Sequence, residues 1–496
     1  MAIEPPRAAP ATVPALVPQE SAPKPALALH DIQGDVVIGL QKNFQRFIFF
    51  AIDDVAQFKA KLRGVLVERI TTSETVAERD KELAELKNYK LHLTLPLVGF
   101  NIAFTKSGID KLRPGVDLGD PSYNAGARKA AAAIQDPVDA SGEPTTWLPA
   151  FASQPIDGVM FVTAGTQDDV DEETHAVLAL LGDEITISYQ ETANVRPGAE
   201  RGHEHFGFAD GISQPALDVA NLADPKPGQD VVDPGLFVFG YGSKATPPVA
   251  WMKNGSFMVF RRLRQLVPEF AAYLESQAAT LGMDPVLLGG RMLGRWKSGA
   301  PMELTPLQDD FALGADDQHN NDFDYSDDQA QRRCPFGAHI RKTNPRRDIP
   351  RGGLDIRRII RAGIPYGPEV DSAETQAQKS EADRGLMFVC YQTSIQSQFE
   401  FVQQSWANNP GFVSAAIPPF VKHRPGDGTP VTVGFDPIIG QNKNHAQERT
   451  TDEPVPNYPT GNTRSTLHAP SDFVVPTAAA YFFVPSIDAL RNDLTA

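Results

Sequence analysis

The chain is short of cysteine and of long apolar runs, and each shortage excludes a class of protein. Its 496 residues contain two cysteines, Cys334 and Cys390, which are too few for a disulfide framework, although a single bridge between them stays possible. No stretch of about 18 uncharged apolar residues occurs, so the sequence predicts no membrane-spanning helix. Basic side chains number 46 against 62 acidic ones, giving a net charge of -16. This charge disfavours nucleic acids and anionic membrane surfaces as partners.

The overall composition is that of a globular protein. Hydrophobic residues make up 41% and charged residues 22% of the chain, so we expect a buried core, and the length predicts two domains. Residues 1–29 are rich in proline and alanine and predict a flexible tail. Prolines interrupt any apolar signal segment there, so either the protein is not secreted by that route or its signal has been removed. We place an N-terminal domain at residues 30–217 and a C-terminal domain at residues 218–496.

Hydrophobic periodicity predicts interleaved strands and helices after Asp31. Expected strands cover residues 47–52, 98–104, 158–163, 184–190, 235–240, 256–261 and 386–391. Expected helices cover residues 72–87, 168–181 and 268–281, and another helix carries Ile395, Phe399, Val402 and Trp406 on one face. The order of these elements indicates two α+β halves.

Three short segments hold the candidate functional residues. In residues 207–211, two glycines bracket Asp210, a pattern for which an Asp-Gly turn is the ordinary interpretation. Residues 334–345 are basic and contain His339; a zinc site would need more N or S ligands than this segment offers, whereas one histidine suffices for haem iron. A hydrogen-bonded structural histidine is the alternative. Residues 357–367 place Arg361 before a Gly and Pro turn, so its side chain lies either on a solvated basic face or in a cleft.

Taken together and in this order, the three segments resemble the dye-decolourising peroxidase superfamily. The family's Gly-x-x-Asp-Gly motif matches residues 207–211, and its histidine and distal arginine segments are similar to residues 334–345 and 359–367. Residues 294–301 are similar to another recurrent stretch, and the resemblance covers nearly all of the chain after Asp31. The loops at residues 320–325 and 434–441 look most like the larger fungal-type members.

The resemblance implies an α+β fold with two ferredoxin-like domains, each an antiparallel sheet with peripheral helices. It also implies haem b in a cavity mainly within the C-terminal half. By motif position, His339 is expected to bind the iron, and Asp210 and Arg361 are expected to act on hydrogen peroxide. Leu386 and Phe388 match residues that line the distal pocket in similar proteins.

The resemblance further implies a haem peroxidase that oxidises dyes, phenols and other reductants through a ferryl intermediate. A carboxylate such as Asp210 can shuttle the peroxide proton, and Arg361 can stabilise the negative charge that develops as the O–O bond breaks. Asp436 is the candidate acceptor for the second ring N–H of His339, with a turn aspartate as the alternative. Dyes are too bulky for a small buried pocket, so Trp406 and Tyr366 are candidate surface sites of oxidation, although core packing is the favoured interpretation of Trp406.

Two further functional interpretations stay open at this point. One is an enzyme that handles haem itself, and the other is a haem carrier with incidental peroxidase activity, which has no need of an acid and an arginine above the iron. We expect a monomer or homodimer. An extracellular location is expected from the resemblance, with a cytoplasmic one as the alternative.

Overall fold

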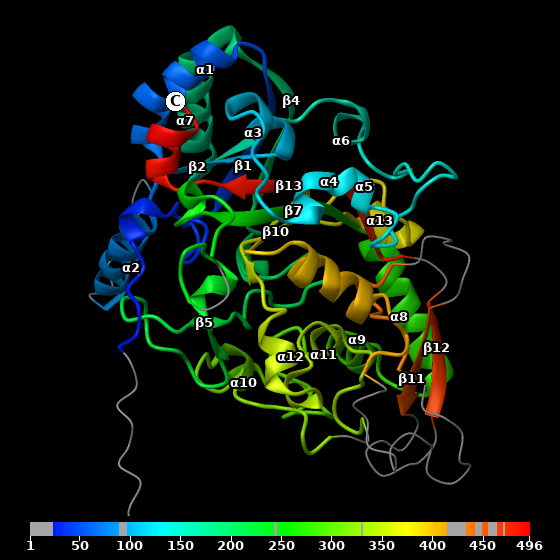
Figure 1. The fold of residues 1–496 in the computed structure, drawn as a ribbon. Helices are drawn as coiled ribbons and strands as arrows, with labels where there is room; N and C mark the ends of the chain where they lie inside the picture. Colours follow the sequence, from blue (N-terminus) through cyan, green and yellow to red (C-terminus); the bar gives the residue numbers. More distant parts are fainter. Residues whose placement is uncertain are drawn as a thin grey trace, which may run out of the picture.

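A large antiparallel sheet forms the frame of the protein in the computed structural model, which describes residues 23–88, 97–242, 246–328, 331–413, 433–441, 449–454, 464–469 and 472–496. Over these residues the sheet has nine strands, which fall into an N-terminal and a C-terminal group (Figure 1). The N-terminal group is β1 (Phe44–Ile52), β2 (Gly99–Phe104), β3 (Gly158–Ala164) and β4 (Ile185–Asn194). The C-terminal group is β7 (Ser256–Gln265), β8 (Ile360–Arg361), β9 (Ile364–Tyr366), β10 (Gly385–Gln392) and β13 (Val474–Val484).

The N-terminal strands lie in the order β4-β1-β3-β2, and the two inner strands of this half are more buried than the edge strand β4. Every side chain of β2 and β3 is buried, as expected for strands that are covered on both faces. The long helix α7 (Gln167–Leu181) packs on β1 and β3, and its first turn is capped by the Thr166 side chain. The other helices of this half are α1 (Val55–Lys61), α2 (Ser73–Asn88), α3 (Lys106–Leu112), α4 (Pro121–Ala125), α5 (Ala127–Ala130) and α6 (Pro149–Ser153).

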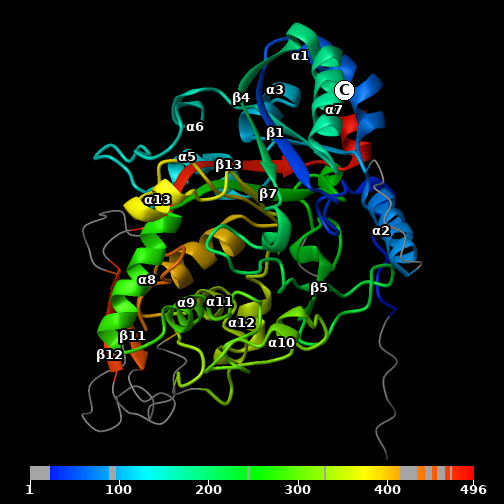
Figure 2. The same ribbon diagram turned by 180° about the vertical axis from the view of Figure 1, so that it is seen from behind.

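The C-terminal strands continue the sheet as β13-β7-β10-β8, with β9 also paired to β10. Beneath them lies a layer of helices and long loops (Figures 1 and 2). Its helices are α8 (Val267–Leu281), α9 (Pro285–Leu293), α10 (Phe311–Ala315), α11 (His339–Thr343) and α12 (Arg351–Asp355), while α13 (Ser372–Ala377) lies near one end of the sheet. Two small strand pairs, β5 (Ala216–Leu217) with β6 (Val231–Val232) and β11 (Arg449–Pro454) with β12 (Arg464–Ala469), lie outside the large sheet. The predicted α+β class with antiparallel sheets is confirmed.

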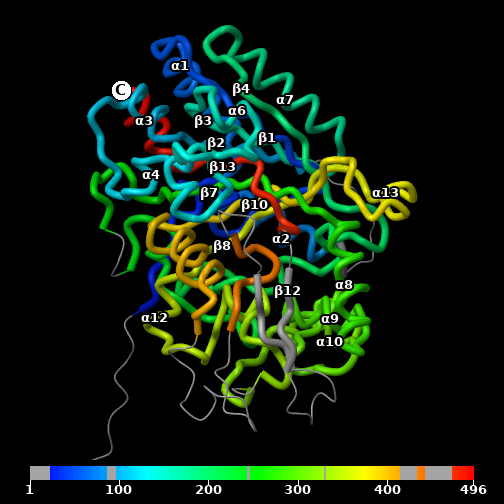
Figure 3. Tube along the Cα trace, turned by 90° about the vertical axis from the view of Figure 1, so that its right-hand side faces the viewer, coloured from blue at the N-terminus to red at the C-terminus, as the bar shows by residue number. Residues whose placement is uncertain are grey.

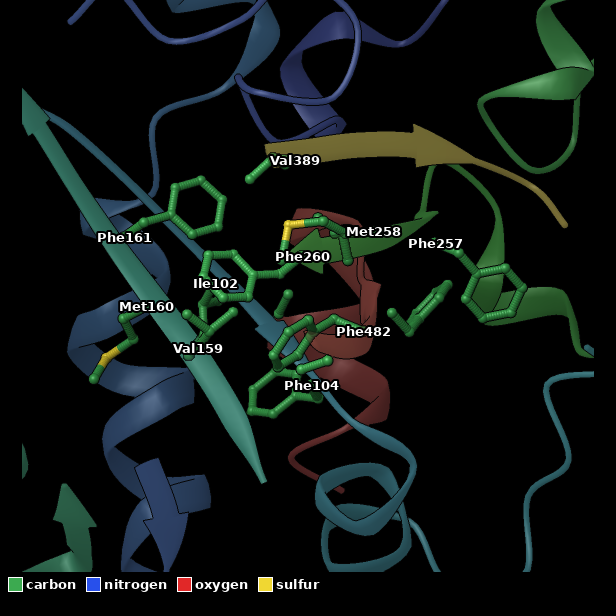
Figure 4. Packing of buried hydrophobic residues seen from close by; sticks show 14 of the residues in the cluster. Ile102, Phe104, Val159, Met160, Phe161, Phe257, Met258, Phe260, Val389 and Phe482 are labelled. Carbon is green, nitrogen blue, oxygen red and sulfur yellow. The ribbon is translucent and has the colours of Figure 1, made fainter. Parts of the chain in front are cut away.

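The two groups of strands meet at β2 and β13, which pair at one position, Phe483 opposite Phe104. The Gln33 side chain completes this junction: its amide accepts from Ile102 N–H at 2.8 Å and donates to Ile102 C=O at 2.9 Å. Packed aromatic side chains fill the space behind the junction, including Phe260 and Phe482 (Figure 4). The two halves therefore share one continuous core, and Figure 3 shows the helices α1, α3 and α7 on one side of the sheet and α8, α9 and α12 on the other.

Most expected elements are present, but the strand expected at residues 235–240 is wrong. Pro234–Leu236 forms a 3-10 turn, which begins where the Asp233 side chain accepts from Gly235 N–H. The following residues are buried as irregular backbone, with Phe239 N–H bonded to Gly255 C=O. An apolar run in the sequence can thus indicate buried residues that do not pair with a neighbouring strand.

The helix expected after β10 is present as two consecutive π-helical segments, Gln396–Glu400 and Val402–Ala407. Ile395, Phe399, Val402 and Trp406 are all buried, which confirms the predicted apolar face. Cys334 and Cys390 are both free and buried, so they do not form the bridge that the sequence left possible.

Residues 1–22 lie outside the described part of the chain. The backbone that follows is held to the rest of the protein at Leu27, whose N–H donates to the Asn221 side chain and whose C=O accepts from it. Within the described residues, none of the helices has the length and apolarity needed to cross a membrane.

Candidate active site

A deep cavity lies between the C-terminal strands and the helical layer beneath them. Its empty volume, counted to the open mouth, is ≈ 1890 Å³. Much of the wall comes from the loop after β4, strands β7 and β10, helix α11 with the segment that follows it, and the segment before β8. The two π-helical segments after β10 and residues 438–441 also contribute side chains. Asp210, His339, Arg361, Leu386 and Phe388 all line this one cavity. The structure therefore brings together residues that are far apart in the sequence.

Asp210 projects from a tight loop whose shape requires its two glycines. Gly207 and Gly211 have φ values of 91° and 80°, a backbone conformation that side-chain-bearing residues rarely adopt. The loop is fixed further by Asp210 N–H donating to Gly202 C=O at 3.0 Å and by Ala209 N–H donating to Lys297 C=O at 3.1 Å. The Asp-Gly turn expected at residues 207–211 is therefore present, and it places the Asp210 carboxylate at the cavity.

Arg361 forms an ion pair with Asp210 across the cavity wall. Its Nη1 donates to Asp210 Oδ1 at 2.8 Å, and its Nη2 donates to Ser213 C=O at 3.2 Å. Asp210 Oδ1 also accepts from Gly211 N–H at 2.6 Å. Among the described residues no hydrogen bond to Asp210 Oδ2 is present, so this oxygen is free to exchange a proton.

The pKa of Asp210 results from two opposing effects. Burial among protein atoms raises the pKa, but the charge of Arg361 and the hydrogen bonds to the carboxylate outweigh it and hold the pKa below the ordinary aspartate value. The side chain is 37% exposed, and that exposed surface faces the cavity. Asp210 is therefore a carboxylate at all but strongly acidic pH.

His339 begins α11 and is oriented by Asp436. Its Nδ1 lies 2.8 Å from Asp436 Oδ2, while Asp436 Oδ1 accepts from Ile438 and Ile439 N–H. Because a carboxylate accepts hydrogen bonds, Nδ1 carries the proton and Nε2 keeps its lone pair for a metal ion. The Asp436 side chain is fully buried, so this hydrogen bond is shielded from water. The pairing predicted from the sequence is present.

Leu386 and Phe388 form part of the wall from β10. They alternate with buried Met387 and Val389 along the strand, so both side chains lie on the same face of the sheet. Their cross-strand partners on β7, Leu263 and Arg261, line the same cavity. The wall is thus mostly apolar, with one guanidinium among its side chains.

A group of arginines at the cavity was not identified from the sequence. Arg346 donates to Asn321 and Phe323 C=O and to the Asn321 side chain, and burial lowers its pKa. Arg358 forms an ion pair with Asp230, but its buried Nε has no hydrogen-bond partner among the described residues. Both guanidiniums line the cavity, which suits an anionic group such as a carboxylate. Arginines spaced through loops carry no local signal for this role.

The two candidate surface sites of oxidation are not at the surface. Trp406 is 3% exposed and stacks on Phe412 with ring centroids 5.1 Å apart, which agrees with the favoured interpretation as core. Tyr366 is 1% exposed; its ring lies against the Arg262 guanidinium, and its hydroxyl donates to Asp383. Neither ring can receive an electron from a bulky donor by direct surface contact.

The donor set of the cavity fits haem and does not fit a metal held by protein alone. No cluster of three or more His, Cys, Asp or Glu side chains that could bind a metal ion is found in the part of the chain described. The cavity offers instead one imidazole, apolar walls and the buried Arg346 and Arg358. These features suit haem, because a histidine could bind its iron, apolar walls could pack on its ring and arginines could pair with its anionic propionates.

Comparisons with known proteins agree with this geometry. The family model described as "DyP dimeric alpha+beta barrel domain" matches residues 31–197, and the model "Dyp-type peroxidase, C-terminal" matches residues 206–426. Dye-decolorizing peroxidase msp1 of Mycetinis scorodonius is 40% identical over 491 residues, which cover 95% of this chain and 88% of that protein.

Solved structures are similar over the same extent. A variant of the dye-decolorizing peroxidase from Pleurotus ostreatus has a TM-score of 0.86 and 40% identity, covering 94% of this chain and 99% of that one. A dye-decolorizing peroxidase in complex with 2,6-dimethoxyphenol has a TM-score of 0.79 and 39% identity, covering 95% of this chain and 100% of that one.

Proposed function

Because this chain belongs to the dye-decolourising peroxidase family, whose members are haem peroxidases, we propose that His339 binds the haem iron and that Asp210 and Arg361 act on hydrogen peroxide. The observation that carries this proposal is the convergence of two oriented pairs on one cavity, Asp210 with Arg361 and His339 with Asp436. A haem carrier needs the second pair alone. The presence of the first pair therefore favours an enzyme over a haem carrier.

The haem, when bound, supplies the redox chemistry that reduces peroxide to water and draws electrons from a reductant. Asp210 supplies the proton transfer. With Oδ1 held by Arg361 and Gly211, its Oδ2 can take the proton from one peroxide oxygen and deliver it to the other, which leaves as water. Because Arg361 holds the pKa of Asp210 below the ordinary aspartate value, the carboxylate keeps its basic form in more acidic solution than an ordinary aspartate would.

Arg361 has two roles in this account. Its guanidinium stabilises the negative charge that develops on the departing oxygen, and it keeps Asp210 ionised. Lysine could not replace it, since a single ammonium cannot hold both Asp210 and Ser213 C=O with the same fork of donors.

Asp436 acts through His339. By accepting the Nδ1 proton it fixes the imidazole tautomer and the ring orientation, and it makes Nε2 a stronger electron donor to a metal. Leu386 and Phe388 supply apolar surface against the haem ring, and Arg346 and Arg358 supply positive charge for its propionates.

The proposed reductants are phenols and dyes. A dye-decolorizing peroxidase of similar fold has been solved in complex with 2,6-dimethoxyphenol, and the cavity of this chain offers the apolar side chains Leu386 and Phe388 for an aromatic ring. Bulkier dyes require transfer of electrons from a position nearer the surface than Trp406 or Tyr366. Secretion and a monomeric or homodimeric state are part of the same proposal, and both follow from the family resemblance alone.

Replacing Arg361 with Leu is expected to slow the reaction with peroxide by about 10²- to 10³-fold, the usual effect of removing one donor that stabilises developing negative charge. It should also move the acidic limb of the rate profile to higher pH, because the raising effect of burial on the pKa of Asp210 is then opposed mainly by the hydrogen bond from Gly211 N–H. The measurement is the second-order rate constant with peroxide, per haem, between about pH 3 and 7. An unchanged rate and limb would show that Arg361 acts elsewhere.

Replacing Asp436 with Asn is expected to raise the haem reduction potential and to weaken haem binding about 10- to 100-fold, as losses of a histidine's hydrogen-bond partner do. The amide has no charge to favour the proton on His339 Nδ1, so the imidazole becomes a weaker electron donor. Redox titration followed by absorbance measures the potential. If the potential and the spectrum both stay as in the wild type, Asp436 is a turn residue only.

A further inference from the structure

Arg361 lies on the outer edge of the large sheet, on a strand that is two residues long. β8 is the last strand in the order and is paired on one side only, to β10. Ala362 N–H donates to Val389 C=O of β10 at 2.9 Å, and Arg361 faces Cys390. In an antiparallel pair this register turns the N–H and C=O of Arg361 itself away from β10, toward the free edge. An edge of this kind presents unpaired backbone groups.

The Gln214 side chain lies at that edge and forms hydrogen bonds with both the N–H and the C=O of Arg361. Arg361 N–H donates to Gln214 Oε1 at 3.1 Å, and Gln214 Nε2 donates to Arg361 C=O at 2.7 Å. A primary amide has the same donor and acceptor arrangement as a peptide group, so Gln214 acts as a one-residue strand partner for Arg361. Gln214 also lines the cavity.

We propose that Gln214 is a positioning residue that holds Arg361 at the correct distance from Asp210. Gln214 follows Asp210 on the same loop, and Ser213 C=O between them accepts from Arg361 Nη2. The loop that carries the acid is thereby joined to the strand that carries the arginine by hydrogen bonds to both the backbone and the guanidinium of Arg361. The inference rests on the proposed roles of Asp210 and Arg361.

The chain contains a matched clamp elsewhere, which supplies the control. Gln33 makes the same two hydrogen bonds to the backbone of Ile102, at 2.8 and 2.9 Å, at the junction of the two half-sheets. Gln33 does not line the cavity. Gln33 Nε2 also donates to Pro485 C=O at 2.9 Å, so Gln33→Met removes at least as many hydrogen bonds as Gln214→Met. Of the two clamps, the one made by Gln214 alone reaches the proposed distal pair.

In Gln214→Met we expect the rate constant with peroxide, per haem, to fall about 10- to 100-fold, since a misplacement of about 1 Å in a catalytic group has effects of this size. The KM for a phenolic reductant should stay within about twofold, because the clamp touches no group proposed to bind it. Hydrogen exchange at the Arg361 amide should accelerate in apoprotein and in haem-loaded protein alike, because Gln214 is its acceptor. Gln33→Met should change neither the peroxide rate nor exchange at Arg361.

In Gln214→Glu, we expect acidic pH to restore the peroxide rate, which would not happen if the substitution only disturbed packing. An ionised carboxylate accepts from Arg361 N–H but cannot donate to Arg361 C=O, whereas a protonated one does both. Relative to wild type at the same pH, the peroxide rate of this variant should therefore recover as the pH falls from about 7 to about 4, while Gln214→Met shows no recovery. The wild type and both Gln214 variants share the same charged and titratable groups in this part of the cavity, which include Asp210, Asp230, His339, Arg358 and Arg361.

The outcomes separate this inference from the function on which it rests. Slow peroxide reaction in Gln214→Met, fast exchange at Arg361 and acid recovery in Gln214→Glu support the clamp. If both Gln214 variants react as the wild type does while Arg361→Leu is slow, the clamp is wrong and the proposed function stands. If Arg361→Leu and Asp210→Asn are also as fast as wild type, the proposed function itself is wrong.

Discussion

Replacing Asp210 with Asn is expected to slow the reaction with hydrogen peroxide by about 10²- to 10⁴-fold, the range usual for loss of a general acid–base group. The amide oxygen can still accept from Arg361 Nη1 and Gly211 N–H, so the loop should keep its shape. What is lost is the free carboxylate oxygen Oδ2, the atom proposed to exchange the proton between the two peroxide oxygens. Stopped-flow absorbance with haem-loaded protein gives the rate constant per haem.

Asp309→Asn is the matched control for this prediction. Asp309 also accepts a hydrogen bond, from the Ser298 hydroxyl, but it does not line the cavity. Its substitution should leave the peroxide rate unchanged. If Asp210→Asn reacts as fast as the control does, then the proton is moved by another group or by solvent.

Replacing His339 with Ala is expected to weaken haem binding by more than about 100-fold, because loss of the ligand should exceed the effect of losing its hydrogen-bond partner. His339 is the histidine of this cavity, and its Nδ1 proton is fixed by Asp436, which leaves Nε2 for the iron. Added imidazole should restore part of the haem absorption spectrum, since a free ligand can enter the space left by the side chain. Titration of apoprotein with haem, followed by absorbance, measures the affinity.

His203→Ala controls for the general effect of removing a histidine. The His203 ring is hydrogen-bonded to Arg201 C=O, and His203 does not line the cavity. Haem affinity should stay at the wild-type level in this variant. Equal affinities in the two alanine variants would mean that the iron is bound through another group.

The sequence predicted the buried strands well because their apolar runs end at turn residues. The runs at residues 158–163 and 386–391 became β3 and β10 within two residues of the expected ends. The run at residues 235–240 failed for a physical reason: its side chains are buried, but its backbone bonds to loops such as Gly255 and Thr393. Periodicity reports burial, and the partner that makes a strand is distant in sequence.

The site could be predicted through its motifs, which also indicated the pairing of His339 with Asp436, but its other long-range contacts could not be predicted. Gly207 and Gly211 indicate the Asp210 loop in the sequence, because the positive φ values of this loop favour glycine at both positions. No local pattern joins Gln214 to Arg361, which lie 147 residues apart, or turns Arg346 toward the cavity. The burial of Trp406 followed from its place on the apolar face of a predicted helix, whereas the burial of Tyr366 did not, since a tyrosine in a short strand is suited to core and surface roles alike.

The most direct test of the account is the absorption spectrum of the haem-loaded wild-type protein after mixing with one equivalent of hydrogen peroxide. We predict rapid conversion to an oxidised spectrum that decays when a phenol such as 2,6-dimethoxyphenol is added, with one equivalent of peroxide oxidising two equivalents of phenol by one electron each. A protein that takes up haem at His339 and keeps its resting spectrum after peroxide is added would contradict the assignment of Asp210 and Arg361 as a catalytic pair.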